Sequence, residues 1–168
     1  ALLIIVIGLV LFFVFPTNER AFVSSNLARI RANILLQKIP LPDGMEELAS
    51  WGNVVVYNSE CYMGVANVLA GTDLDIDMVG SFYETFFANW DWKFTNDLHT
   101  KSPHFFASNN RLIEGVRVDY CDKTCLSYLD VPTTVIQAAQ EEYENFYLIW
   151  TWYYPVEART LLCANYGW

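Results

Sequence analysis

The sequence predicts an α+β protein in which an N-terminal transmembrane helix continues into a stalk helix, followed by an antiparallel sheet with two packed helices. Three observations lead to this prediction. Residues 1–15 contain no polar side chain. Apolar residues then recur at helical spacing up to two prolines near residue 40. Beyond them the apolar pattern changes to a period of two, interrupted by two amphipathic helical segments.

The apolar run is shorter than the roughly 17–25 residues of a spanning helix. It has neither a basic segment before it nor a small-residue cleavage site after it, so it does not match a signal peptide. We therefore expect residues 1–16 to be the C-terminal part of a membrane anchor whose start precedes Ala1. The protein is then single-pass and in contact with the lipid bilayer.

A stalk helix is predicted over residues 17–39. Four apolar residues lie on one helical face at spacings of four, three and four: Val23, Leu27, Ile30 and Ile34. Pro40 and Pro42 then force extended backbone. The stripe fits three uses, namely packing on the protein's own domain, on a partner's helix, or in the membrane interface. We expect it to bind other membrane-protein subunits, with Arg29 and Arg31 available for acidic partners.

Residues 40–168 are predicted to form one extracytoplasmic α+β domain that folds without the stalk. The expected strands cover 54–57, 62–69, 90–94, 104–107, 112–120 and 146–154, and the expected helices 75–89 and 133–143. The strand at 146–154 is apolar on both faces. Either helices cover both sides of it or one face docks to a partner.

All four cysteines lie beyond the anchor, and an even number fits two disulfides in an oxidising compartment. We expect a local Cys121–Cys125 bridge that closes a hairpin, which leaves Cys61 to pair with Cys163. Free thiols and a four-cysteine zinc site are the alternatives. The basic residues after the anchor would place the domain in the cytoplasm by the positive-inside rule. The cysteines favour the outside, which we adopt.

Charge and motifs narrow the function further. Residues 41–168 carry a net charge of −12, which argues against nucleic acid as a partner. Asp73, Asp75, Asp77 and Glu84 occupy calcium-loop positions, but Met78 replaces the required glycine, so we interpret the acids as a helix N-terminus. His99 and His104, with Asp97 and Ser102 nearby, lack the arrangement of a catalytic triad. We expect no metal, no cofactor and no enzymatic activity.

Three segments carry a resemblance to a known group of proteins: residues 39–48 (IPLPDGMEEL), 72–94 and 112–120. In them the chain resembles small bacterial membrane-anchored or lipoprotein-like extracytoplasmic α+β domains, most of which have no assigned activity. Where those domains commonly have glycine before the tryptophan, this chain has Asp91 before Trp92. The resemblance implies a bacterial, extracytoplasmic, membrane-anchored protein.

Together these features predict a non-catalytic accessory subunit that docks or stabilises a larger bacterial membrane complex at its extracytoplasmic face. Two alternatives stay open: a pilin-like filament subunit, and a ligand-binding membrane-anchored domain. Against the pilin-like alternative, the apolar run lacks the acidic residue that pilins place near its start.

Overall fold

The structure is a computed structural model that describes residues 16–56, 62–98, 103–109 and 114–154, with side chains from residue 26 onward except at 56 and 62. The predicted anchor at residues 1–16 therefore lies almost entirely outside the described residues. Within the described part of the chain, no helix has both the length and the apolar character needed to cross a membrane.

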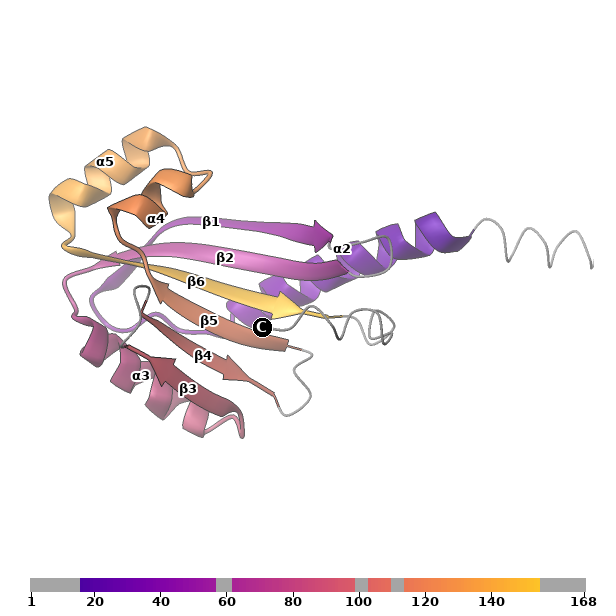
Figure 1. Cartoon of the computed structure of the whole chain (residues 1–168), viewed down its shortest axis with the longest axis horizontal. Coiled ribbons are helices and arrows are strands. Elements are labelled where there is room, and N and C mark those ends of the chain that lie inside the picture. Colours follow the sequence, from indigo (N-terminus) through magenta and orange to yellow (C-terminus); the bar gives the residue numbers. More distant parts are fainter. Residues whose placement is uncertain (1–15, 57–61, 99–102, 110–113, 155–168) are drawn as a thin grey trace, which may run out of the picture.

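The described residues form one six-stranded antiparallel sheet, in the order β1-β2-β6-β5-β4-β3 (Figure 1). The strands are β1 (Met45–Val56), β2 (Tyr62–Thr72), β3 (Lys93–Asp97), β4 (His104–Ser108), β5 (Glu114–Tyr120) and β6 (Asn145–Tyr153). The helices are α2 (Pro16–Leu36), α3 (Ile76–Ala88), α4 (Lys123–Tyr128) and α5 (Thr133–Glu142). The predicted α+β class with an antiparallel sheet is confirmed.

Helices cover both faces of this sheet. We call the face that packs against α2 and α3 the inner face and the opposite one the outer face. The core between α2, α3 and the inner face includes Leu35, Tyr83, Phe87, Phe105 and Ile149. On the outer face, α4 and α5 cover one end of β2 and β6 (Figure 1). Since β6 lies inside the sheet, this arrangement accounts for its two apolar faces.

Local sequence signals explain where the predicted helices begin. Asp75 is the N-cap of α3, and its Oδ1 accepts a hydrogen bond of 2.8 Å from the backbone N–H of Met78. Pro132 directly precedes α5, where its fixed φ suits the start of a helix. Helices α3 and α5 match the ranges 75–89 and 133–143 predicted from periodicity to within two residues.

The contact between α2 and the sheet is unusually close. A Cβ built on Gly64 of β2 would lie 2.1 Å from the backbone carbonyl carbon of Ala28, so no side chain fits between the two elements. Ala28 and Ala32 are fully buried, and the Thr151 hydroxyl of β6 donates a 2.8 Å hydrogen bond to the Ala32 carbonyl oxygen. Small residues and one buried hydrogen bond therefore fix the second half of α2 onto β2 and β6.

This packing corrects the predicted division between a stalk at 17–39 and a domain at 40–168. Leu35 and Ile39 belong to the main core, so the helix from about residue 28 is part of the domain. The prediction placed the boundary at the prolines because chain direction changes there. The prolines mark the end of the helix, but they do not show which residues of the helix are buried against the sheet.

Three further predictions differ from the structure. The strand expected at 90–94 is observed as β3 at Lys93–Asp97, because residues 89–91 form a turn in which Asp91 has a φ of 54°. The first strand begins at Met45 and not at residue 54, because a bulge between Glu47 and Ala49 breaks the alternation on which the prediction relied. The segment after Cys121 is a short helix, α4, and not a hairpin turn, with Asp122 as its N-cap. A two-turn helix is too short for periodicity to reveal.

Candidate docking surface

The side of α2 that faces away from the sheet carries an exposed apolar stripe. Leu27, Ile30 and Ile34 are 52%, 50% and 42% exposed, whereas Ala28, Ala32 and Leu35 on the same helix are buried. At 100° per residue the mean directions of the two sets are roughly 130° apart around the helix axis. The described part of the domain therefore leaves Leu27, Ile30 and Ile34 of the predicted stripe about half exposed. The side chain of Val23 lies outside the described residues.

Basic residues border this stripe unevenly. Arg29, Arg31 and Lys38 are all exposed. By helical geometry Arg31 lies along one edge of the stripe and Arg29 points to the far side of the helix, whereas Lys38 lies in the turn after α2 ends at Leu36. The prediction grouped Arg29 with Arg31, but the helix separates them. Of these three, Arg31 is the base that α2 positions to meet an acidic partner covering the stripe.

The stripe alone is a weak binding surface. Burying a whole Leu or Ile side chain contributes about 1.5–3 kcal/mol, and each of these is already half covered. Three half-exposed residues then contribute roughly 3 kcal/mol, less than the affinity of a millimolar complex. Such a surface is effective when a shared membrane raises the local concentration of the partner.

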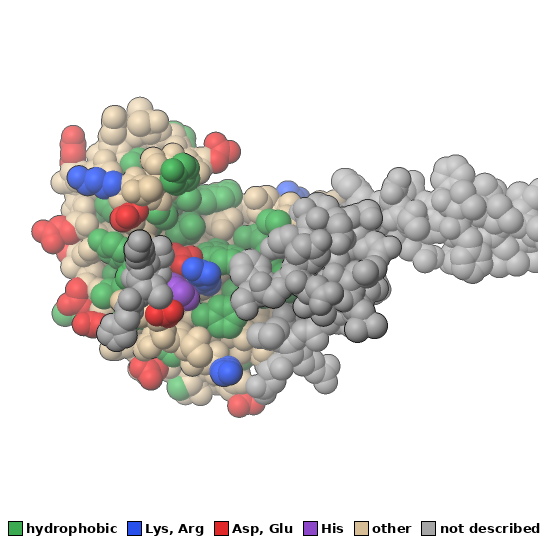
Figure 2. Space-filling view, viewed as in Figure 1, with side chains coloured by type: hydrophobic (Ala, Val, Ile, Leu, Met, Phe, Trp, Pro, Cys, Tyr) green, Lys and Arg blue, Asp and Glu red, His purple; other side chains and the backbone are tan. Residues whose placement is uncertain are grey.

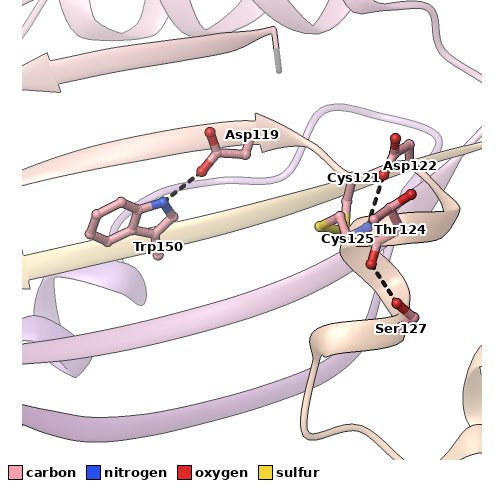
Figure 3. Close-up of a disulfide and its surroundings, with 7 residues drawn as sticks. All are labelled: Asp119, Cys121, Asp122, Thr124, Cys125, Ser127 and Trp150. Atoms are coloured by element: carbon pink, nitrogen blue, oxygen red, sulfur yellow. Dashed lines mark hydrogen bonds between the residues drawn. A yellow bond between two sulfur atoms is a disulfide. The ribbon is translucent and has the colours of Figure 1, made fainter. Parts of the chain in front are cut away.

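The outer face carries a second cluster that the sequence analysis missed. In Figure 2, which looks onto this face, hydrophobic side chains are interspersed with charged ones between α4 and β3. The indole N–H of Trp150 donates a 2.8 Å hydrogen bond to a carboxylate oxygen of Asp119 (Figure 3). Arg117 Nε lies 2.7 Å from the other carboxylate oxygen of Asp119. The Arg117 guanidinium also lies over the Trp150 ring, 5.8 Å from its centroid.

These contacts give the Arg117–Asp119–Trp150 cluster a structural role. Arg117 is opposite Trp150 in the β5–β6 register, and Asp119 lies two residues along the same face. Both carboxylate oxygens of Asp119 and the indole N–H are thereby satisfied, which fixes the orientation of Trp150. The sequence pattern that indicates a polar row on this face is the alternation of Arg117 and Asp119 with the apolar residues Val116 and Val118.

The predicted bridge between Cys121 and Cys125 is present. The two Cα atoms are 5.1 Å apart, and the disulfide spans the start of α4 (Figure 3). Asp122 Oδ1 accepts from the backbone N–H of Cys125 at 2.8 Å, and Cys121 donates its backbone N–H to Phe146. The bridge therefore joins the end of β5 to α4, whose Leu126 packs with Leu69 and Phe146 on the outer face of the sheet. Cys61 and Cys163 lie outside the described residues.

The acidic residues near α3 form a helix N-terminus, as interpreted from the sequence. Asp75 caps the helix, and Asp73 Oδ1 accepts from the backbone N–H of Glu144 at 3.2 Å. In the described part of the chain, no three His, Cys, Asp or Glu side chains are grouped as metal ligands would be. His104 is paired in register with Asp97 and Asp119 on neighbouring strands, while His99 and Ser102 lie outside the described residues.

Comparison with known proteins adds no functional information. No protein-family model matches the chain, and neither a curated protein nor a solved structure is significantly similar to it.

Proposed function

We propose that the protein is a non-catalytic, single-pass accessory subunit that docks onto a larger bacterial membrane complex at its extracytoplasmic face. The observation that carries the proposal is the two-sided character of α2. Its inner side is fixed to the sheet by Ala28, Ala32 and the Thr151 hydrogen bond, and its outer side keeps Leu27, Ile30 and Ile34 half exposed.

The position of the stripe supports a partner close to the membrane. The helix begins at Pro16, directly after the apolar residues 1–15 that we propose as the anchor. A partner held in the same membrane meets the stripe at a high local concentration, which compensates for the small apolar area. Acidic residues on that partner would pair with Arg31 at the edge of the stripe.

The extracytoplasmic location rests on the cysteines and on the resemblance to bacterial membrane-anchored domains. A disulfide between Cys121 and Cys125 persists in an oxidising compartment. The proposal expects Cys61 and Cys163 to be bridged as well, which peptide mapping under non-reducing conditions measures.

The test replaces two residues of the stripe. The double variant Leu27→Asp/Ile30→Asp should lose co-purification with its partner subunits in mild detergent, because it places two charges on the docking surface. The matched control is Thr134→Asp/Gln137→Asp, which adds the same two charges at the same spacing on the exposed side of α5. Far-UV circular dichroism of both variants should match that of the wild type.

Three outcomes would reject the proposal. The double variant of α2 stays bound as well as the control, the purified protein is monomeric with a catalytic turnover of its own, or only further copies of this chain co-purify. The last result would favour the pilin-like alternative, in which the same stripe joins identical subunits.

A further inference from the structure

A cavity of about 400 Å³ lies between α2 and the first strand of the sheet. Asn33, Leu36 and Gln37 line it from the last turns of α2, and Ile39 and Leu41 from the segment that follows. Val68 and Ile149 line it from β2 and β6, and Glu47 and Ser50 from β1. Its volume falls in the range of about 300–1,000 Å³ that is typical of small-molecule sites.

The bulge in β1 brings the polar groups of that strand into the cavity. Glu47 is paired with Ala70 and Ser50 with Val68, so both side chains lie on the inner face of the sheet. In a regular strand, residues three apart point to opposite faces. The extra residue between Glu47 and Ala49 removes this conflict, as bulges that re-aim a side chain do.

The lining combines apolar and polar side chains. Val68 and Ile149 are buried sheet residues, and Leu36, Ile39 and Leu41 add aliphatic surface beside them. The polar groups are the amides of Asn33 and Gln37, the Ser50 hydroxyl and the Glu47 carboxylate. A ligand for this site therefore has an aliphatic body and one hydrogen-bonding end.

The charges around the cavity indicate which charge the hydrogen-bonding end of the ligand carries. Glu47 is the sole ionisable group among the described residues that line the cavity, and neither Arg29 nor Lys38 is among them. The C-terminal end of α2, which carries the negative pole of the helix dipole, lies at the same cavity. Residues 41–168 have a net charge of −12, which further favours a cation over an anion.

From this geometry we propose that the α2–β1 cavity binds a small organic ammonium ion. The aliphatic body packs on Val68, Ile149 and Leu36, and the ammonium group donates to the Glu47 carboxylate. Asn33, Gln37 and Ser50 supply neutral hydrogen-bonding groups around it. This site is separate from the docking stripe, because Leu27, Ile30 and Ile34 are not among its lining residues.

The test uses three probes of equal chain length with the full chain in detergent: hexylammonium, 1-hexanol and hexanoate. We expect hexylammonium to bind saturably at millimolar concentration or below in calorimetric titration. Hexanol should bind at least about tenfold more weakly, because it lacks the charge-assisted hydrogen bond. Hexanoate should show no binding.

Two neighbouring glutamates provide a matched pair of variants. Glu47→Gln should weaken hexylammonium binding at least about tenfold. Glu46→Gln removes the same charge one residue away, where Glu46 lies opposite Gly71 in register and hydrogen-bonds Tyr143, raising the pKa of that phenol to about 12. This control should bind hexylammonium as the wild type does.

A third variant, Ser50→Phe, should abolish binding by filling the cavity without changing its charge. The proposal is overturned if the wild type does not bind hexylammonium up to about 10 mM, a concentration at which millimolar sites saturate. It is also overturned if Glu46→Gln weakens binding as much as Glu47→Gln, which would indicate non-specific attraction to the acidic surface, or if Glu47→Gln has no effect.

Discussion

At the scale of single residues, buried polar groups tie distant elements of the chain together. The Tyr83 hydroxyl of α3 donates to the Pro40 carbonyl oxygen at 3.3 Å, and the Thr151 hydroxyl of β6 donates to Ala32 of α2. Both side chains are fully buried. The hydrophobic periodicity of the sequence cannot predict such contacts, because each contact joins residues that are far apart in the sequence.

Burial raises the pKa of Tyr83 above its ordinary value of about 10, which makes stability depend on alkaline pH. Above pH 10 the phenol ionises in the unfolded chain but stays protonated in the fold. The unfolded state then binds fewer protons, so this part of the stability is complete below pH 10 and is lost as pH rises.

Tyr83→Phe should therefore reduce the loss of unfolding free energy between pH 10 and 12, by up to about 1.4 kcal/mol per pH unit for one proton. Urea unfolding at a series of pH values measures this slope. Tyr128→Phe is the control, because the Tyr128 side chain is 83% exposed, and its slope should equal that of the wild type. Equal slopes for all three proteins would contradict the account of Tyr83.

At the scale of elements, the contact of α2 with β2 decides which side of the helix is available for docking. The helix approaches the strand through Ala28, Ala32 and Gly64, and Leu27, Ile30 and Ile34 are directed outward. Side-chain size and spacing in the sequence predict the apolar stripe, but they do not distinguish packing on the domain from packing on a partner. Close approach of two backbones requires small residues instead.

Gly64→Ala tests this contact. The added Cβ meets the backbone of Ala28 and Arg29, which can be relieved only by moving the whole helix. We expect a loss of at least about 2–3 kcal/mol in the free energy of unfolding, which exceeds the gain of up to about 1 kcal/mol from replacing glycine in a strand.

The control for that variant is Gly52→Ala on the neighbouring strand, where the nearest atoms belong to the amide side chain of Asn33. A side-chain amide moves easily, so this variant should lose less than about 1 kcal/mol. Similar unfolding midpoints for the two variants would show that α2 is not tightly fixed to β2.

The predictability of the other elements follows the strength of their local signals. The cap of α3 at Asp75 and the apolar run of β6 are local, and both were predicted to within about one residue. The bulge in β1 and the short α4 have no periodic signal. The cavity at Glu47 could not be predicted from the sequence, because it forms only where the bulge of β1 and the end of α2 come together in the fold.

At the scale of the whole molecule, the last two turns of α2 belong to the folded domain while its outer face is a candidate interface. The main core includes Leu35 and Ile39 together with residues of β2, β4, β5 and β6. A protein divided at residue 40 would lose one wall of this core. The helix is therefore both a structural element and the proposed connection to a partner.

A truncated chain of residues 41–168 should fail to fold cooperatively, whereas residues 16–168 should give a single unfolding transition. Removal of the helix exposes Gly64, Ala66 and Thr151, which α2 buries. Thermal unfolding followed by near-UV circular dichroism compares the two. A cooperative transition in the shorter chain at the same temperature would restore the boundary first predicted from the sequence.

The most direct test of the central claim is photo-crosslinking from the outer stripe of α2 in native membranes. A photoreactive amino acid at Ile30 should crosslink to one distinct membrane protein, and the same amino acid at Gln137, exposed on α5, should not. Mass spectrometry of the crosslinked band identifies the partner. No protein crosslink from Ile30, or the same crosslinks from both positions, would contradict the claim that α2 is the docking surface.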